Sequence, residues 1–138
     1  MVTWLPGYIV TLFMEKKILK FTDIDFYKIA FKLSNYVWNI VKQWDYFSKD
    51  TVGKQYVKAI DSVSANFAEG FGRYGKKDKI NFYRYSFGSI KESMDWTEKA
   101  YKRNLLSDVE YQHIKTELNK LPLLLNQWIK YTNEKLKI

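Results

Sequence analysis

A glycine-rich, basic segment near the middle of the 138-residue chain contains residue types that could bind a nucleotide. Residues 70–75 read GFGRYG and match G-x-G-x-x-G, and Asp95 follows at the distance where dinucleotide-binding folds place an acidic residue. With Lys76 and Lys77, the same glycines nearly match the phosphate loop G-x-x-x-x-G-K-[ST]. Both motifs require a preceding strand within a sheet. A helical pattern precedes these glycines, and Lys77 replaces the magnesium-binding hydroxyl, so the sequence predicts a turn between two helices.

Positive charge gathers on this turn and on the predicted start of the following helix. Cations near a helix N-terminus oppose the helix dipole, so the arrangement favours a bound anion such as phosphate, which also accepts from free backbone N–H groups. Such contacts would be insensitive to base sequence, and a tyrosine beside them can stack on an unpaired base. A solvated basic turn is the alternative, and the sequence leaves both open. The candidate nucleic-acid-binding residues are Arg73, Tyr74, Lys76, Lys77, Lys79 and Arg84.

No set of residues in the sequence predicts catalysis, a metal site or a bound cofactor. Asn66 and Glu69 lie three residues apart on one predicted helix face, and we interpret them as buried polar groups that fix helix register. His113 is the only histidine and follows Glu110 by three residues, which is half of a di-iron helix pair. The other half is missing, so His113 is predicted to be an exposed helix residue. With one such histidine, no Ser-His-Asp arrangement can be argued.

The composition is that of a single folded domain with a large positive charge. Apolar residues make up 46% of the chain, and 23 Lys and Arg against 15 Asp and Glu give a formal net charge of +8. Such a surplus favours polyanionic partners. The absence of cysteine excludes disulfides, thiolate metal sites and thiol nucleophiles, and it fits a cytoplasmic location.

Residues 1–22 are predicted to be an N-terminal extension of a domain that spans residues 23–138. The apolar stretch 2–13 is interrupted by Pro6 and Gly7 and lacks the flanking residues of a secretory signal. It is also too short to cross a bilayer, so no membrane partner is expected. Met14 is a candidate for the natural start of the chain.

Four segments show apolar residues at alternating steps of three and four, which predicts amphipathic helices. Their approximate ranges are residues 23–47, 49–71, 77–104 and 107–137. No segment alternates like a strand, and the connection between the third and fourth segments is short enough to make them antiparallel neighbours. The sequence therefore predicts an all-α protein, an up-down-up-down four-helix bundle.

Several residues are expected to shape these helices. Ser48 is predicted to cap the second helix, and Gly70 and Gly72 to provide its end. Ser107 and Glu110 form a capping-box pattern at the start of the fourth helix. In the same helix Pro122 removes a backbone donor, which predicts a bend near Leu118.

Two features predict how the first and third helices pack. In the first helix a second apolar seam lies beside the main one and is predicted to be buried with it. That seam contains Ile24, Tyr27, Phe31, Trp38 and Val41. In the third helix, small residues recur along one stripe and suggest close contact with another helix or another subunit. Gly88 costs that helix about 1 kcal/mol relative to alanine, which predicts a packing reason for it.

The central stretch resembles the 23S rRNA intervening-sequence protein family. The resemblance rests on SANFAEG at residues 64–70, on Gly72-Arg73, on FYR at 82–84 and on GSIKE at 88–92. It covers roughly residues 21–133, and the sequence departs from the family pattern at Phe67, where isoleucine is usual, and at the acidic Asp61. The matching motif positions are Asn66, Glu69, Gly70, Gly88, Ser89 and Glu92.

The resemblance implies a four-helix bundle that assembles as a ring, most simply a homopentamer. Members are encoded within intervening sequences of bacterial ribosomal RNA genes. The family is similar to the accessory protein of diversity-generating retroelements, which binds a reverse transcriptase and nucleic acid, and it gives the motif residues no catalytic duty. We therefore expect a non-enzymatic, oligomeric RNA- or DNA-binding accessory protein. The alternative is a protein-interaction scaffold, for example for a reverse transcriptase.

Overall fold

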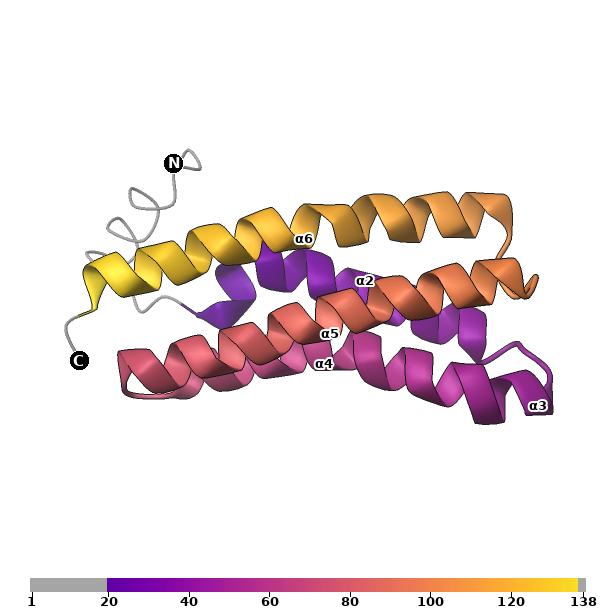
Figure 1. Cartoon of the computed structure of the whole chain (residues 1–138), viewed down its shortest axis with the longest axis horizontal. Coiled ribbons are helices and arrows are strands. Elements are labelled where there is room, and N and C mark those ends of the chain that lie inside the picture. Colours follow the sequence, from indigo (N-terminus) through magenta and orange to yellow (C-terminus); the bar gives the residue numbers. More distant parts are fainter. Residues whose placement is uncertain (1–19, 137–138) are drawn as a thin grey trace.

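The computed structural model describes residues 20–136, and all regular structure in that range is helical (Figure 1). The predicted extension up to residue 19 and the last two residues lie outside the described part. A short 3-10 turn, η1 (Phe21–Asp23), precedes the first long helix. Between the first and second long helices, a short helix α3 (Tyr46–Ser48) is followed by the π-helical segment η2 (Lys49–Gly53), which continues directly into the second long helix. The four long helices are α2 (Asp25–Val41), α4 (Lys54–Gly72), α5 (Lys76–Lys102) and α6 (Asp108–Lys135).

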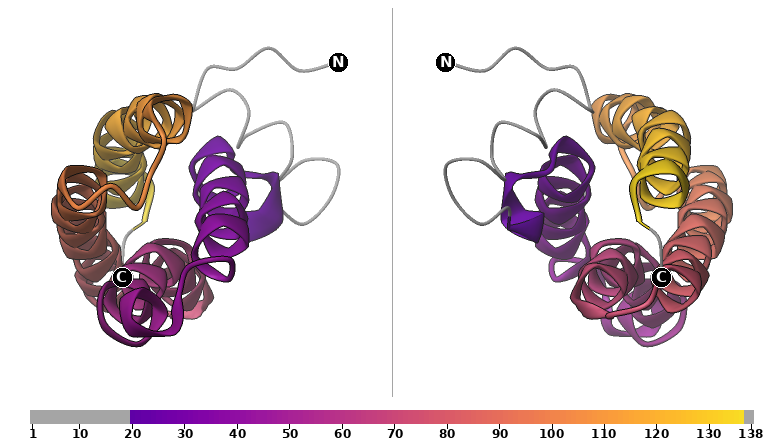
Figure 2. Two further views of the ribbon diagram at one scale, coloured as in Figure 1. Left: turned by 90° about the vertical axis from the view of Figure 1, so that its right-hand side faces the viewer. Right: turned by 90° about the vertical axis from the view of Figure 1, so that its left-hand side faces the viewer.

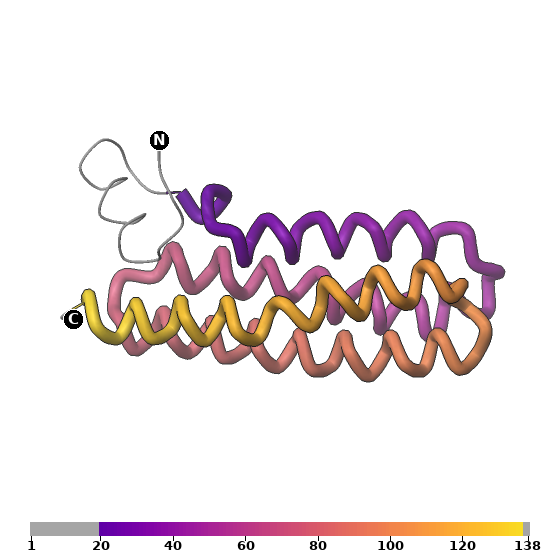
Figure 3. Tube along the Cα trace, turned by 90° about the horizontal axis from the view of Figure 1, so that it is seen from above, coloured from indigo at the N-terminus to yellow at the C-terminus, as the bar shows by residue number. Residues whose placement is uncertain are grey.

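The long helices alternate in direction along the chain and form one bundle (Figures 1 and 3). Each helix packs against two others, in the cyclic order α2, α4, α5, α6, as the end-on views in Figure 2 show. The predicted up-down-up-down four-helix bundle is confirmed. None of the helices in the described range combines the length and the apolar character needed to cross a membrane.

One aromatic ring from each long helix joins a buried cluster in the half of the bundle that carries the α4–α5 turn. The ring of Phe67 on α4 lies 4.9 Å from that of Phe26 on α2, 5.1 Å from Tyr83 on α5 and 5.9 Å from Trp128 on α6, measured between ring centroids. Phe67 is fully buried, and burial raises the pKa of the Tyr83 hydroxyl to about 12. Because each long helix contributes one ring, this cluster joins all four helices, and aromatic rings bury large apolar areas.

Two buried hydrogen bonds between side chains of α5 and groups of α4 fix the register of these helices. The hydroxyls of Tyr56 and Thr97 lie 2.7 Å apart, and Ser86 Oγ donates to the Val63 carbonyl oxygen over 2.6 Å. The sequence pattern predicts this role for Asn66 and Glu69, and that prediction is wrong. Glu69 is exposed, and the half-buried Asn66 donates to a carbonyl of its own helix, that of Ser62.

The first predicted helix is interrupted before residue 47. Helix α2 ends at Val41, and the Asp45 side chain accepts from the Ser48 backbone N–H over 3.1 Å, which caps the start of the next helical segment. This geometry lowers the pKa of the Asp45 carboxyl, chiefly through its hydrogen bonds with Ser48. Ser48 is therefore inside the helical run, and the prediction that it is the N-cap is wrong. An aspartate side chain that bonds to the N3 amide is a preferred N-cap.

The later helix ends agree better with the sequence. The reciprocal capping box of Ser107 and Glu110 is confirmed, with bonds of 2.9 and 3.1 Å. Helix α6 continues through Pro122. Helix α5 ends at Lys102, and Asn104 adopts a left-handed φ of 61° while the Leu105 N–H bonds back to the Ala100 carbonyl. Asparagine is one of the few residues that tolerates this conformation after a helix.

The second predicted seam of the first helix is only partly buried. Ile24 and Val41 are in the core, but Phe31 is 50% exposed and Trp38 is 54% exposed. The prediction that both seams are buried is therefore wrong for these two aromatic side chains.

Candidate nucleic-acid interface

The basic turn connects α4 to α5 at the end of the bundle where α6 finishes (Figure 1). Arg73, Tyr74 and Gly75 lie between the helices, Lys76 and Lys77 begin α5, and Lys79 and Arg84 follow within that helix. The structure thus brings all six predicted contact residues to one end of the molecule, but it gives them different roles.

Arg73 is held by contacts within the chain. Its guanidinium lies 2.8 Å from Glu69 and 3.5 Å from Asp78, and it stacks 4.6 Å above the centre of the Phe82 ring. The three groups hold the guanidinium beside the turn, and the two carboxylates offset its charge. All of these side chains are partly exposed, so the ion pairs contribute little to stability.

Two of the lysines bond to backbone carbonyl groups. Lys79 donates to the Phe71 carbonyl oxygen over 2.6 Å and lies 3.5 Å from that of Gly70, so it caps the C-terminal end of α4. Partial burial lowers the pKa of its ammonium group. Lys76 donates over 3.2 Å to the Asn133 carbonyl oxygen and links the start of α5 to α6. These contacts assign both lysines a structural role that the sequence analysis did not predict.

The remaining three residues face solvent. Tyr74 is 83% exposed, and Lys77 and Arg84 are also exposed. Within residues 20–136, neither Lys77 nor Arg84 has a carboxylate within 4.0 Å. Lys77 and Arg84 are seven residues apart on α5, a spacing that puts both on one face of the helix. Their charges are available to a phosphate group at this end of the bundle.

The glycines of the turn do not build a nucleotide cradle. Gly70 and Gly72 belong to α4, and no glycine in the described range has a positive φ. A Cβ atom at Gly70 would lie 2.8 Å from the Tyr83 ring and 2.9 Å from the Lys79 carbonyl oxygen. Gly70 is therefore required for the close packing of α4 on α5, which corrects the prediction that it ends the helix.

The other family-motif positions lie on the outer side of α5. Glu92 accepts from the Trp96 indole N–H over 3.2 Å, and Ser89 is half-buried. Gly88 is exposed, and a Cβ atom there would meet no atom of residues 20–136 within 4 Å. Within this part of one chain, no packing contact explains the glycine.

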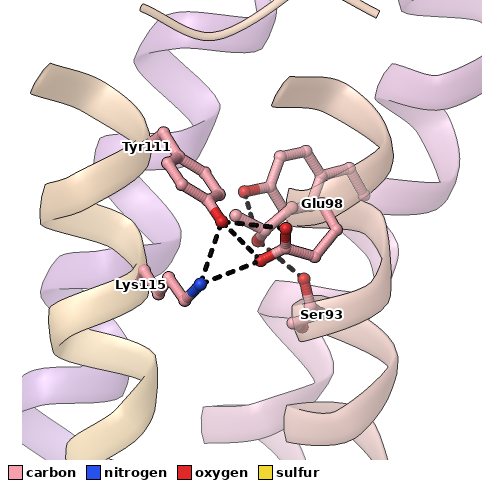
Figure 4. Close-up of polar contacts among 6 residues, drawn as sticks. Ser93, Glu98, Tyr111 and Lys115 are labelled. Carbon is pink, nitrogen blue, oxygen red and sulfur yellow. Dashed lines mark hydrogen bonds and ion pairs between the residues drawn. The ribbon is translucent and has the colours of Figure 1, made fainter. Parts of the chain in front are cut away.

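A polar cluster lies between α5 and α6 and joins the two helices (Figure 4). The Tyr111 hydroxyl lies 2.8 Å from both carboxylate oxygens of Glu98, and Lys115 donates to that hydroxyl over 3.0 Å. The hydrogen bond with Tyr111, followed by the charge of Glu98, raises the pKa of Lys115. Because the carboxylate, hydroxyl and ammonium groups bond to one another, the cluster acts as a tie between helices.

His113 is exposed, as predicted, and its ring centroid lies 4.4 Å from that of Tyr36. In the described part of the chain, no three His, Asp or Glu side chains are grouped so that they could hold a metal ion.

Comparisons with known proteins agree with this architecture. Residues 22–127 match the family model of the 23S rRNA-intervening sequence protein. The structure is similar to the crystal structure of a protein of unknown function from the S23 ribosomal protein family of Bacteroides thetaiotaomicron, with a TM-score of 0.68 and 19% sequence identity over 76% of this chain and 98% of that one. No curated protein matches the chain. Because the family model covers most of its length, the chain belongs to the 23S rRNA-intervening sequence protein family.

Proposed function

We propose that the protein is a non-enzymatic, oligomeric accessory protein that binds RNA or DNA through phosphate contacts at the α4–α5 turn. The observation that carries the proposal is the exposure of Tyr74 in the turn and of Lys77 and Arg84 in α5, where the described structure places no carboxylate within 4.0 Å of either cation. The family name, which refers to intervening sequences of 23S rRNA, favours RNA as the partner.

The contacts within the chain favour three of the six candidate residues as the main contacts to nucleic acid. Lys77 and Arg84 supply charge to phosphates, and Tyr74 supplies a ring for an unpaired base. Arg73 also lies at the turn, and its ion pair with Asp78 is long at 3.5 Å. A phosphate could therefore replace Asp78 as its partner. Lys76 and Lys79 hold the turn in place through their carbonyl contacts. Repetition of the turn in an oligomer would multiply weak contacts into useful affinity.

Replacing Lys77 and Arg84 together with alanine should weaken RNA binding without unfolding the protein. Each lost phosphate contact should reduce the slope of log affinity against log salt by about one. Fluorescence anisotropy with a labelled structured RNA, measured from low to physiological salt, gives both the affinity and this slope.

The matched control replaces Lys102 and Arg103, an exposed pair at the opposite end of α5, with alanine. It removes the same net charge and should leave most of the affinity intact. Equal losses in the two double variants would show that only net charge matters and would contradict the assignment of the turn. Absence of binding by the unaltered chain at low salt would refute the proposed function as a whole.

Self-association through the outer side of α5 is the second part of the proposal. An exposed glycine inside a helix lowers helix stability, and no contact within residues 20–136 requires one at position 88. Close approach of a second chain would explain it. The neighbouring Tyr85 is 54% exposed and offers apolar area to such a contact.

Light scattering on a sizing column should give a mass that is a multiple of the 16.6 kDa chain, five times in the case of a homopentamer. Gly88→Gln should shift the protein to smaller species, because its long side chain blocks close approach. Thr51→Gln, on an exposed residue of η2, is the control and should keep the assembly. A monomeric unaltered chain, or an assembly untouched by Gly88→Gln, would argue against this interface.

A further inference from the structure

A groove between α2 and α4 combines an exposed tryptophan with a ring of lysines. It lies towards the end of the bundle that carries α3, away from the α4–α5 turn (Figure 1). Its volume is about 460 Å³, and its floor is formed by apolar groups of Val41, Val57 and the backbone at Gly53. That size falls within the range of about 300–1,000 Å³ that is typical of ligand-binding clefts.

Trp38 forms one wall of the groove and is 54% exposed, although its position in the apolar pattern predicts burial. Beside it the two helical segments approach each other closely: a Cβ atom at Gly53 would lie 2.8 Å from Val41 Cγ1. Exposed apolar area of this kind, rimmed by polar residues, is typical of interaction sites.

Four exposed lysines surround this apolar floor: Lys42, Lys49, Lys54 and Lys58. Lys54 pairs with Asp50 at 3.1 Å, and Lys49 donates to the Lys42 carbonyl oxygen over 3.4 Å. For Lys42, Lys49 and Lys58, the described chain places no carboxylate within 4.0 Å. Like charges so close together repel one another, and a polyanion would relieve that repulsion.

We propose that the α2–α4 groove is a second nucleic-acid site, which binds an unpaired stretch of RNA or DNA. An unpaired base stacks on the Trp38 indole, and the lysines on either side of the groove contact the adjoining phosphates. Aromatic rings beside cations are the usual features of single-strand sites, whereas a duplex hides the faces of its bases. This inference rests on the proposed function and adds to it a preference for unpaired segments.

The test compares binding of a ten-nucleotide oligouridylate and a ten-base-pair RNA duplex to the full chain. Trp38→Ala should weaken oligouridylate binding about tenfold, as expected for the loss of one stacked base, and should leave duplex binding unchanged. Trp38→Phe keeps a ring and should retain most of the affinity. Oligouridylate should also quench the tryptophan fluorescence of the unaltered chain more strongly than that of Trp38→Phe.

Two controls keep the test decisive. Tyr46→Ala removes another exposed aromatic side chain, outside the groove, and should leave both affinities unchanged. If Trp38→Ala lowers the melting temperature, a variant with Lys42 and Lys58 changed to glutamine serves as the test instead. It should show the same selective loss of oligouridylate binding.

Three outcomes would overturn the groove site. The first is unchanged oligouridylate affinity in Trp38→Ala, and the second is an equal loss for duplex and single strand. The third is a change of assembly mass in Trp38→Ala without a change in affinity, which would make the groove a contact between copies of the chain. In each case the effect of Lys77→Ala and Arg84→Ala still tests the turn separately.

Discussion

Replacing Gly70 with alanine should destabilise the protein by about 2 kcal/mol, the cost typical of adding a methyl group to a closely packed site. The new Cβ atom would lie 2.8 Å from Tyr83 Cε1 and 2.9 Å from the Lys79 carbonyl oxygen. The ring cannot move aside easily, because Tyr83 is buried and stacks on Phe67. The backbone of α5 must therefore shift away from α4. Urea denaturation followed by circular dichroism measures the loss.

Gly72→Ala is the matched control, because it makes the same change two residues later in the same helix. A Cβ atom at Gly72 would meet no atom of the described part of the chain within 4 Å. Alanine is also the better helix former, so this variant should be as stable as the unaltered chain or more stable, by up to about 1 kcal/mol. If both variants lost stability equally, backbone conformation would be the cause, and the close contact of Gly70 with α5 would not explain its presence.

The apolar pattern predicts the four helices because each buries a continuous face, but it does not report where a helix is interrupted. Ile40 and Trp44 continue the seam of the first helix across its end at Val41, and both still pack against the core. The interruption depends on Asp45, whose side chain caps the next helical segment. Asp45 and Ser48 are spaced as an N-cap and its N3 residue, which is the feature that could have revealed the boundary.

Burial within the first helix was harder to predict, for a physical reason. Phe31 and Trp38 are as apolar as the core residues, yet a helix in a four-helix bundle has only one face turned inward. Which of two adjacent seams is buried depends on the packing of α4 and α6 against α2. The apolar pattern of α2 alone does not show how α4 and α6 pack against it.

In the candidate site, too, the sequence predicts one feature and leaves another open. The clustering of cations between α4 and α5 follows from the order of residues in the chain, and the structure places them together. The hydrogen-bond partners of these cations do not follow from the order of residues. Lys76 bonds to the carbonyl of Asn133, which is 57 residues away, and Lys79 bonds to a carbonyl at the end of α4. Tertiary contacts therefore decide which cations remain available to a ligand.

The buried pair Tyr56 and Thr97 should show unequal and non-additive effects when its hydroxyl groups are removed. Thr97 Oγ1 donates to the Ser93 carbonyl oxygen over 2.7 Å, so it must accept from the Tyr56 hydroxyl. A tyrosine hydroxyl carries its proton at neutral pH, and burial raises the pKa of this one further. Thr97→Val should cost about 1–3 kcal/mol, because it leaves a buried donor without an acceptor. Tyr56→Phe removes the donor itself and should cost about 0.5–1.5 kcal/mol.

The double variant Tyr56→Phe/Thr97→Val should therefore be no less stable than Thr97→Val alone, because it no longer contains the unsatisfied hydroxyl. Urea denaturation of all four proteins gives the interaction energy as a double-mutant cycle. Tyr46→Phe, at a tyrosine that is 77% exposed, is the control and should leave stability unchanged. Additive losses in the cycle would mean that the two hydroxyls do not bond in solution. The register of α4 on α5 would then depend on Ser86 and on the close contact at Gly70.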